Sequence, residues 1–131
     1  MRMKVYCVDL APIPWQRPKL TGSRQRFYDG QVADKVAFGL FLLKQHGQDV
    51  PFSNPVALNI SFYLKIPAGT RIGAKTKHHK TKPDLDNLLK FALDALVDAD
   101  ILSDDRIICQ IIAKKEYSNN PRTEFTIKEV E

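Results

Sequence analysis

The segment from Lys82 to Leu96 reads KPDLDNLLKFALDAL, and its apolar residues decide the fold class. At about 100° per residue, six of them fall in a single stripe along a helix. They are Leu85, Leu88, Leu89, Ala92, Ala95 and Leu96. Pro83 disfavours helical backbone at Lys82, and Asp84 is a favoured N-cap residue, so we expect the helix to run from Asp84 to about Asp98. A helix with one apolar stripe buries it against another element, which we expect to be a sheet.

The rest of the chain predicts the strands of that sheet. Val56 to Ile66 alternates, with Val56, Leu58, Ile60, Phe62, Leu64 and Ile66 on one face. Arg106 to Lys115 carries isoleucines on both faces, which is typical of a central strand. The other predicted elements are a strand from Met3 to Leu10, a loop from Ala11 to Asp29, a helix from Gln31 to Gln45 and a strand from Thr123 to Val130. The order β-α-β-α-β-β predicts an α+β fold with helices packed on one small mixed sheet.

A second apolar repeat supports the helix from Gln31 to Gln45. Val32, Val36, Leu40 and Leu43 recur at helical spacing. Gly47 follows them as a stop signal, so we expect this helix to end just before it.

Length and composition limit the class of protein. The 131 residues fit one domain, 1–131, and 44% hydrophobic with 27% charged residues is a globular balance with enough apolar material for one core. The apolar runs are too short for a transmembrane span, so no membrane partner is expected. The first residues, MRMKVYCVDL, lack a long apolar signal region, and we therefore expect a cytoplasmic location. Cys7 and Cys109 lie in apolar, strand-like stretches and are expected to be free, buried thiols.

Charge is distributed in two blocks that meet at KPDLD. Arg71 to Lys82 holds five Lys/Arg, two His and no acid, whereas Asp84 to Asp105 holds seven of the fifteen acidic residues. A basic segment suggests a polyanionic partner such as nucleic acid. Carboxylates beside it would repel that partner unless a divalent cation neutralised them. The alternative is a solvated loop followed by a helix with a polar face.

The polar residues of the helix share one side. With Asp84 at zero, Asp86 falls at about 200° and Lys90 at about 240°, whereas the apolar stripe centres at about 90°. Asp86 and Lys90 are therefore one turn apart on an exposed side. Two simpler interpretations remain open: Asp84 is only a cap, and Asp86 and Lys90 are only an i,i+4 ion pair.

Further acids precede the next strand, where ILSDD places Asp104 and Asp105. The geometry of the sheet decides whether Asp104 and Asp105 lie close to Asp84 in the folded chain. If they do, the carboxylates suit Mg²⁺ or Mn²⁺ rather than zinc. His78 and His79 are adjacent and do not have zinc-site spacing, and no phosphate-binding glycine motif occurs. Carboxylates, a lysine and a basic surface are what phosphodiester hydrolysis requires.

At KPDLDNLLK, LDAL and ILSDD the sequence resembles the RusA family of Holliday junction resolvases. PIPWQRPK and RFYDG resemble that family's early Pro- and Arg-rich segment, and KEYSNNPRTEFTI resembles its closing hairpin. The resemblance implies that Asp84, Asp86 and Asp105 bind the catalytic metal and that Lys90 is the catalytic lysine, with Asp104 a weaker candidate. It further implies a homodimer that uses Mg²⁺, or Mn²⁺ in its place, to nick two opposed strands of a four-way junction.

Other basic and aromatic residues are candidates for DNA contact. We expect phosphate contacts from Arg17, Lys19, Arg71, Lys75, Lys77, Lys80 and Lys82. Trp15, Phe27 and Tyr28 would stack on unpaired bases or, as the favoured interpretation, anchor the core or an interface. His78 and His79 match no family role and belong either to a solvated loop or to a DNA-contacting arm. The rival functions are a general metal-dependent nuclease for flaps or branched DNA and a non-catalytic DNA-binding protein.

Overall fold

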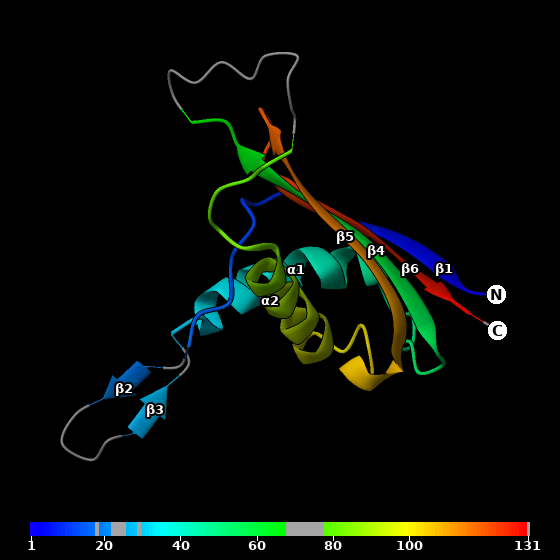
Figure 1. Cartoon of the computed structure of the whole chain (residues 1–131). Coiled ribbons are helices and arrows are strands. Elements are labelled where there is room, and N and C mark those ends of the chain that lie inside the picture. The colour runs from blue at the N-terminus through cyan, green and yellow to red at the C-terminus, as the bar shows by residue number, and fades with distance from the viewer. Residues whose placement is uncertain (18, 22–25, 29, 68–77, 131) are drawn as a thin grey trace.

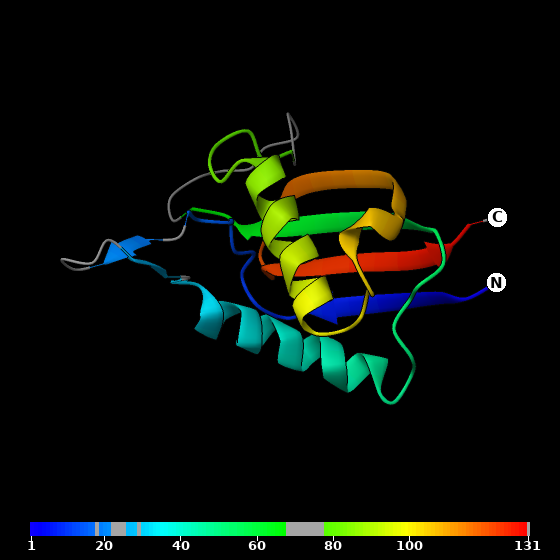
Figure 2. The same ribbon diagram turned by 90° about the horizontal axis from the view of Figure 1, so that it is seen from below.

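The computed structural model describes residues 1–17, 19–21, 26–28, 30–67 and 78–130 of the chain. In this part, four strands form one sheet in the order β1-β6-β4-β5, and two helices lie on one face of it (Figures 1 and 2). The strands are β1 (Met3–Val8), β4 (Val56–Lys65), β5 (Ile108–Ser118) and β6 (Arg122–Glu129), and the helices are α1 (Val32–His46) and α2 (Leu85–Asp98). The predicted α+β architecture is confirmed.

Strand β4 occupies an inner position and carries much of the core. It pairs antiparallel with β6 and parallel with β5. Val56, Leu58, Ile60, Phe62 and Leu64 are buried, and the residues between them are exposed or half-buried, as the alternation predicts. Two parallel strands need a long crossover, and α2 lies in the crossover from β4 to β5. This connection places α2 across the sheet.

The two helices meet over the sheet through aromatic and aliphatic side chains. From α2 the buried residues are Leu88, Phe91, Ala92, Ala95 and Leu96, which confirms most of the predicted stripe and adds Phe91 to it. The rings of Phe38 in α1 and Phe91 in α2 pack edge to face with centroids 5.7 Å apart. No helix in the described ranges is long and apolar enough to cross a lipid bilayer.

The apolar repeat that predicts α1 lies on the solvent side of that helix. Val32, Val36, Leu40 and Leu43 are between 48% and 63% exposed. The buried residues of α1 are instead Phe38, Gly39, Leu42 and His46. The helix ends at His46, and Gly47 adopts a φ of 65°, a left-handed conformation that favours glycine. The repeat therefore identified the helix, but a different face of it contacts the sheet.

The expectation that the strand after Arg106 is central is wrong, because β5 is an edge strand. Ile111 and Ile112 are 39% and 58% exposed. Isoleucines on both faces are typical of a strand covered on both sides. In this fold the helices cover one face of the sheet, so apolar residues of β5 that point elsewhere remain exposed.

The expectation of a loop from Ala11 to Asp29 is also wrong in part. A short antiparallel pair, β2 (Lys19–Thr21) and β3 (Arg26–Tyr28), lies within it, with Lys19 opposite Tyr28. Figure 1 shows this pair projecting away from the sheet and helices. It is a separate two-stranded ribbon, so its strands do not extend the main sheet.

The cysteines are free, as expected, but they are not buried. Cys7 is half-buried on β1 and Cys109 is exposed on β5. Both lie on strands that form the edges of the sheet, where one side of the strand has no neighbouring main-sheet strand to cover it.

Candidate functional site

Asp84 stands at the N-cap of α2, as predicted, with extended backbone at φ −71° and ψ 145°. Its side chain makes no capping hydrogen bond. Leu88 closes the first helical turn by donating its backbone N–H to the Asp84 carbonyl at 3.1 Å. The Asp84 carboxylate is exposed, so capping alone does not account for this aspartate.

Asp86 and Lys90 lie on the exposed side of α2, as the helical angles predict. Asp86 Oδ1 accepts a hydrogen bond from the Asn87 backbone N–H at 2.9 Å. The ammonium of Lys90 lies 3.7 Å from the centroid of the Trp15 ring. Within the described residues Lys90 forms no ion pair with Asp86 or any other carboxylate. The interpretation of these two residues as a simple ion pair is therefore wrong.

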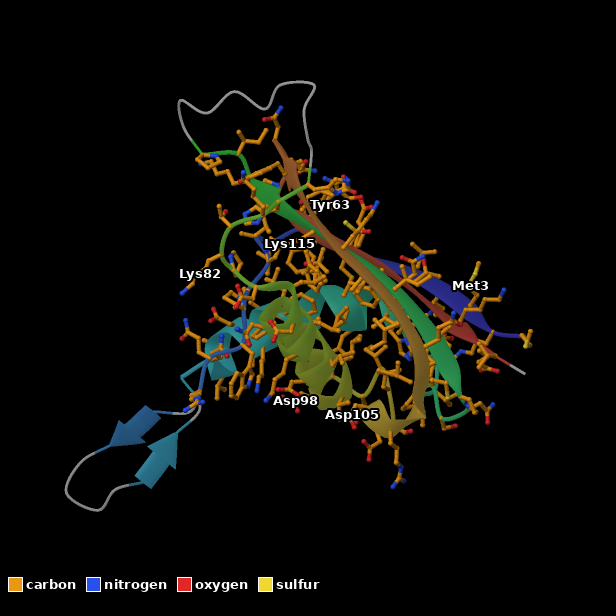
Figure 3. The ribbon with its side chains drawn as sticks, viewed as in Figure 1. Met3, Tyr63, Lys82, Asp98, Asp105 and Lys115 are labelled. Atoms are coloured by element: carbon orange, nitrogen blue, oxygen red, sulfur yellow. The ribbon has the colours of Figure 1, made fainter. Side chains whose placement is uncertain are left out.

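The chain after α2 returns along the helix and brings Asp105 beside it. Asp100, with a φ of 58°, reverses the chain, and Ile101 and Leu102 are then fully buried. Phe52 holds them, since its N–H donates to the Ile101 carbonyl at 2.9 Å and its carbonyl accepts from the Ser103 N–H at 2.9 Å. A 3₁₀ turn, η1 (Asp105–Ile107), follows and leads into β5. Figure 3 shows Asp105 on this turn.

One hollow on this side of the protein gathers acidic groups around the lysine. It has a volume of about 230 Å³ and is lined by Asp86, Leu89, Lys90, Leu93, Asp94 and Asp105. We refer to it as the acidic hollow. The fold thus brings together Asp86, Lys90 and Asp105, three of the four residues predicted for catalysis.

Asp84, the fourth, lines a different hollow. That hollow has a volume of about 390 Å³ and is lined by Pro14, Trp15, Lys82, Pro83, Asp84 and Asn87. Among the residues that the structure describes, no three His, Cys, Asp or Glu side chains are close enough together to hold one metal ion. Asp84, Asp86 and Asp105 are therefore not gathered into one cluster.

The carboxyl groups of Asp104 and Asp105 interact with each other. A hydrogen bond between these side chains is the main cause that lowers the pKa of Asp104 and raises the pKa of Asp105. The negative charge of Asp94 also raises the pKa of Asp105. Asp104 additionally accepts a hydrogen bond from the Arg106 backbone N–H at 3.3 Å, so it caps η1. Asp105, not Asp104, lines the acidic hollow.

Asp94 is a further candidate site residue, which the sequence pattern had not singled out. It lies four residues after Lys90 and eight after Asp86, so it shares their side of the helix. The helical angles that place Asp86 with Lys90 place Asp94 with them as well. Its carboxylate adds a further oxygen donor to the acidic hollow.

The basic residues predicted to contact DNA are only partly described. Arg17, Lys80 and Lys82 are exposed, and Figure 3 shows Lys82 in the segment that leads into α2. The ammonium of Lys115 holds this segment to β5, because it donates to the carbonyls of Thr81 at 2.6 Å and Pro83 at 2.8 Å. Arg71, Lys75 and Lys77 lie outside the described residues, as does the side chain of Lys19.

The two histidines of the basic segment have different environments. His79 is only 8% exposed, packs on the Tyr117 ring with centroids 4.6 Å apart, and donates its backbone N–H to the Lys115 carbonyl at 3.3 Å. Burial is the main cause that lowers the pKa of His79. Neither a solvated loop nor a DNA-contacting arm describes this residue. His78 is exposed and forms a β-bridge with Glu116.

Trp15 is an anchor, in line with the favoured interpretation. It is half-buried and packs against the hydrophobic core. Its backbone N–H donates to the Asn87 carbonyl in α2 at 2.8 Å. The side chains of Phe27 and Tyr28, for which the same role was expected, lie outside the described residues.

Comparison with known proteins identifies the family. Residues 9–128 match the family described as Endodeoxyribonuclease RusA. The chain belongs to the RusA endodeoxyribonuclease family. A 94-residue alignment with the uncharacterized protein YqaN of Bacillus subtilis (strain 168) is 32% identical and covers 66% of each protein, slightly less than two thirds of YqaN.

Among the hollows of the described residues, the acidic hollow is the strongest candidate functional site for a member of this family. Its lining supplies carboxylate oxygens from Asp86, Asp94 and Asp105, and neither Cys nor His lines it. Carboxylates are hard ligands that suit Mg²⁺ or Mn²⁺. The type of oxygen donor therefore suits such an ion, although the described residues do not place three of these carboxylates close enough together to bind it.

Proposed function

We propose that this protein resolves four-way DNA junctions by metal-dependent hydrolysis of phosphodiester bonds. The observation that carries the proposal is the acidic hollow, in which Asp86 and Asp105 lie beside Lys90 on a chain of the RusA family. We further propose Mg²⁺ as the ion, replaceable by Mn²⁺, with Asp86 and Asp105 as ligands from the acidic hollow. Asp84 lines a separate hollow and would complete the set as a third ligand only after a rearrangement at the start of α2.

The metal ion, Lys90, the exposed cations and the carboxylates each have a separate chemical role in this reaction. When bound, Mg²⁺ would polarise the scissile phosphate and lower the pKa of the attacking water. Lys90 offsets the negative charge that develops on the phosphoryl oxygens in the transition state. Arg17, Lys80 and Lys82 are exposed cations that neutralise the backbone phosphates of the DNA arms. The negative charges of Asp86 and Asp105 attract the cation and repel the DNA phosphates, so the acidic hollow binds the ion in preference to the DNA.

Substrate class is tested with one labelled strand presented in three forms. A mobile four-way junction, a flap and a linear duplex are incubated with the protein in Mg²⁺ or in EDTA. We expect paired nicks in opposed strands of the junction only, and none in EDTA. Equal cutting of the linear duplex would refute junction specificity, and preferential cutting of the flap would favour a general nuclease for branched DNA. Full activity in EDTA would refute the requirement for a divalent metal ion.

The site assignment is tested with matched Asp→Asn variants. Asp86→Asn should lose cleavage but still bind the junction. Asp100→Asn is the control, because it makes the same chemical change just beyond α2, outside the hollow, and Asn tolerates the positive φ of 58° at that position. Lys90→Ala should lower the cleavage rate by about 10²–10³-fold while affinity changes little. Full activity of Asp86→Asn would refute the assignment.

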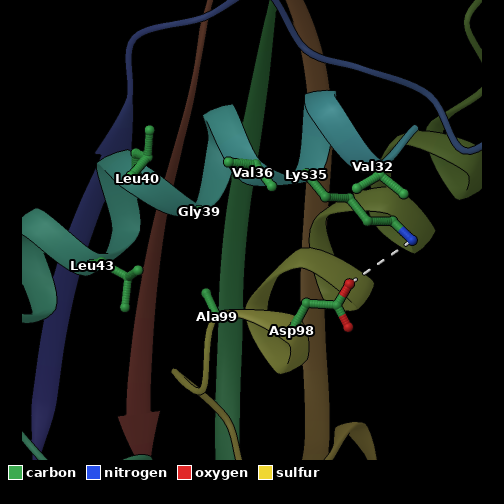
Figure 4. Close-up of a pocket in the computed structure, with 8 residues that line it drawn as sticks. All are labelled: Val32, Lys35, Val36, Gly39, Leu40, Leu43, Asp98 and Ala99. Carbon is green, nitrogen blue, oxygen red and sulfur yellow. Dashed lines mark ion pairs between the residues drawn. The ribbon is translucent and has the colours of Figure 1, made fainter. Parts of the chain in front are cut away.

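We also propose that two copies of the chain associate through the exposed stripe of α1. Figure 4 shows the groove along it, about 250 Å³ in volume and lined by Val32, Lys35, Val36, Gly39, Leu40, Leu43, Asp98 and Ala99. Lys35 and Asp98 neutralise each other at 3.9 Å. The chain carries a net charge of +5, which opposes self-association on its basic surfaces, but this apolar face carries no net charge. A twofold dimer can therefore pair the stripe with itself.

The dimer proposal is tested by sedimentation of two matched surface variants. Leu40 and Ile112 are similarly exposed, at 63% and 58%, on α1 and on β5. Leu40→Glu should yield monomers, whereas Ile112→Glu should remain dimeric. A dimer that survives Leu40→Glu and dissociates in Ile112→Glu would refute this interface, and a monomeric unmodified protein would refute the homodimer.

A further inference from the structure

The indole of Trp15 is the partner of the lysine proposed for catalysis. The Lys90 ammonium lies 3.7 Å from the ring centroid, well within the range of a cation–π contact, which extends to about 6 Å. Lys90 is otherwise exposed, and within the described residues it forms no ion pair. Asp86, one turn away on the same side of α2, is the partner that spacing alone would select. In the structure the Lys90 ammonium contacts the Trp15 ring instead.

Hydrogen bonds hold the backbone at Trp15 and on both sides of it. Its own N–H donates to the Asn87 carbonyl in α2 at 2.8 Å. Gln31, which is 3% exposed, accepts from the Gln16 N–H and donates from Nε2 to the Pro14 carbonyl, both at 2.8 Å. The segment 14–16 is thus tied to α2 and to the start of α1, and the backbone that carries the indole is held by contacts that do not involve Lys90.

A ring and a carboxylate affect a catalytic lysine differently. A carboxylate at ion-pair distance would neutralise the ammonium and compete with a phosphate for it. An aromatic face attracts the cation while its positive charge remains uncompensated. It also restricts a long, flexible side chain that otherwise samples many rotamers.

From this geometry we propose that Trp15 is a positioning residue for Lys90. Trp15 lines the hollow of Asp84 and Lys90 lines the acidic hollow. The indole restricts the ammonium to a position beside both hollows, where it meets the phosphoryl oxygens as charge develops on them. This inference rests on the proposed function, because it assigns Trp15 a part in the cleavage step and not in DNA binding. Trp15 itself need not touch the DNA.

The contact is tested first without any substrate. Trp15 is the chain's single tryptophan, so fluorescence excited selectively in tryptophan reports on it alone. Lys90→Met should change the emission intensity or wavelength, since it removes the cation from the ring face. Lys44→Met, an exposed lysine near the end of α1, is the control and should leave the emission unchanged. Identical emission from Lys90→Met and the unmodified protein would overturn the contact.

The positioning role is tested by single-turnover cleavage of a four-way junction. Trp15→Leu should slow cleavage by about 10-fold or more with junction affinity nearly unchanged, and Trp15→Phe, which keeps an aromatic face, should recover part of the rate. The double variant Trp15→Leu/Lys90→Met should be no slower than Lys90→Met alone, because Trp15 acts through the lysine. Lys44→Met should cleave at the unmodified rate.

Two outcomes would overturn the role, and a third would overturn the proposed function. A Trp15→Leu defect that adds in full to that of Lys90→Met would show that Trp15 does not act through the lysine. A matched loss of junction affinity would make Trp15 a DNA-binding residue. No cleavage by the unmodified protein would refute the nuclease function, and with it any role of Trp15 in the reaction, even where the fluorescence change demonstrates the contact.

Discussion

Removing the hydroxyl of Tyr6 should destabilise the protein through a buried histidine. Tyr6 and His46 are 1% and 4% exposed, and the Tyr6 hydroxyl lies 2.6 Å from His46 Nδ1. His46 Nε2 lies 3.1 Å from the Val50 carbonyl, which can only accept, so Nε2 carries the proton and Nδ1 accepts from Tyr6. Tyr6→Phe therefore keeps the ring and leaves Nδ1 without a donor.

The magnitude follows from that unsatisfied nitrogen. Leaving a buried acceptor unpaired costs about 1–3 kcal/mol, and we expect about 2 kcal/mol for Tyr6→Phe. For a domain of this size that corresponds to a fall in Tm of about 8 °C. The ring of Tyr6 also stacks on Phe125 with centroids 5.0 Å apart, and Phe keeps that contact. The loss is thus assigned to the hydrogen bond.

Urea and thermal unfolding of Tyr6→Phe and of a control measure this loss. Tyr63→Phe is the control, because Tyr63 is only half-buried and Phe retains the ring that stacks under Arg122, whose guanidinium lies 4.0 Å from its centroid. The control should stay within about 0.5 kcal/mol of the unmodified protein. Equal stability of both variants would refute the assigned hydrogen bond.

The same pair predicts how stability depends on pH. Burial is the main cause that lowers the pKa of His46, and the charges of Lys4 and Arg2 lower it further against the backbone hydrogen bond to Val50 and the charge of Asp49. The unfolded chain then binds the proton more readily than the folded one. The contribution of neutral His46 to the free energy of unfolding should be complete above about pH 6.5. It should be lost as the pH falls towards the pKa of His46 in the folded protein. The buried His79 acts in the same direction. Equal stability at pH 7.5 and 5.5 would contradict this.

Three further substitutions test other parts of the fold. Phe91→Ala removes a 1% exposed ring and should cost about 3–5 kcal/mol in urea unfolding, and a loss below 1 kcal/mol would contradict its place in the core. Ile112→Lys should change stability by less than about 0.5 kcal/mol, because this side chain is 58% exposed, whereas a large loss in thermal unfolding would indicate that it is covered. Lys115→Met removes two hydrogen bonds to the segment before α2, and should cost about 1–2 kcal/mol and speed proteolysis there; unchanged cleavage would argue against the tie.

Local patterns predict both helices and the four strands of the main sheet, and they show which residues share a side of α2 and of β4. The leucine stripe of α2 and the alternation of β4 follow from helix and strand geometry, which neighbouring residues in the chain set by themselves. For the same reason the helical angles alone place Asp86 and Lys90 together on an exposed side, and they would also have placed Asp94 there.

Contacts between distant segments decide what each side faces. Asp105 reaches the acidic hollow because Phe52 holds Ile101 and Leu102, and Lys90 meets Trp15 rather than Asp86 because a segment some 70 residues earlier packs against α2. Contacts between distant segments also decide three other features. They leave the apolar repeat of α1 facing solvent, put β5 at the edge of the sheet and place Asp84 in a separate hollow. A hydrophobic period shows which residues point the same way, but only the packing of remote elements determines whether core, solvent or a charged partner lies there.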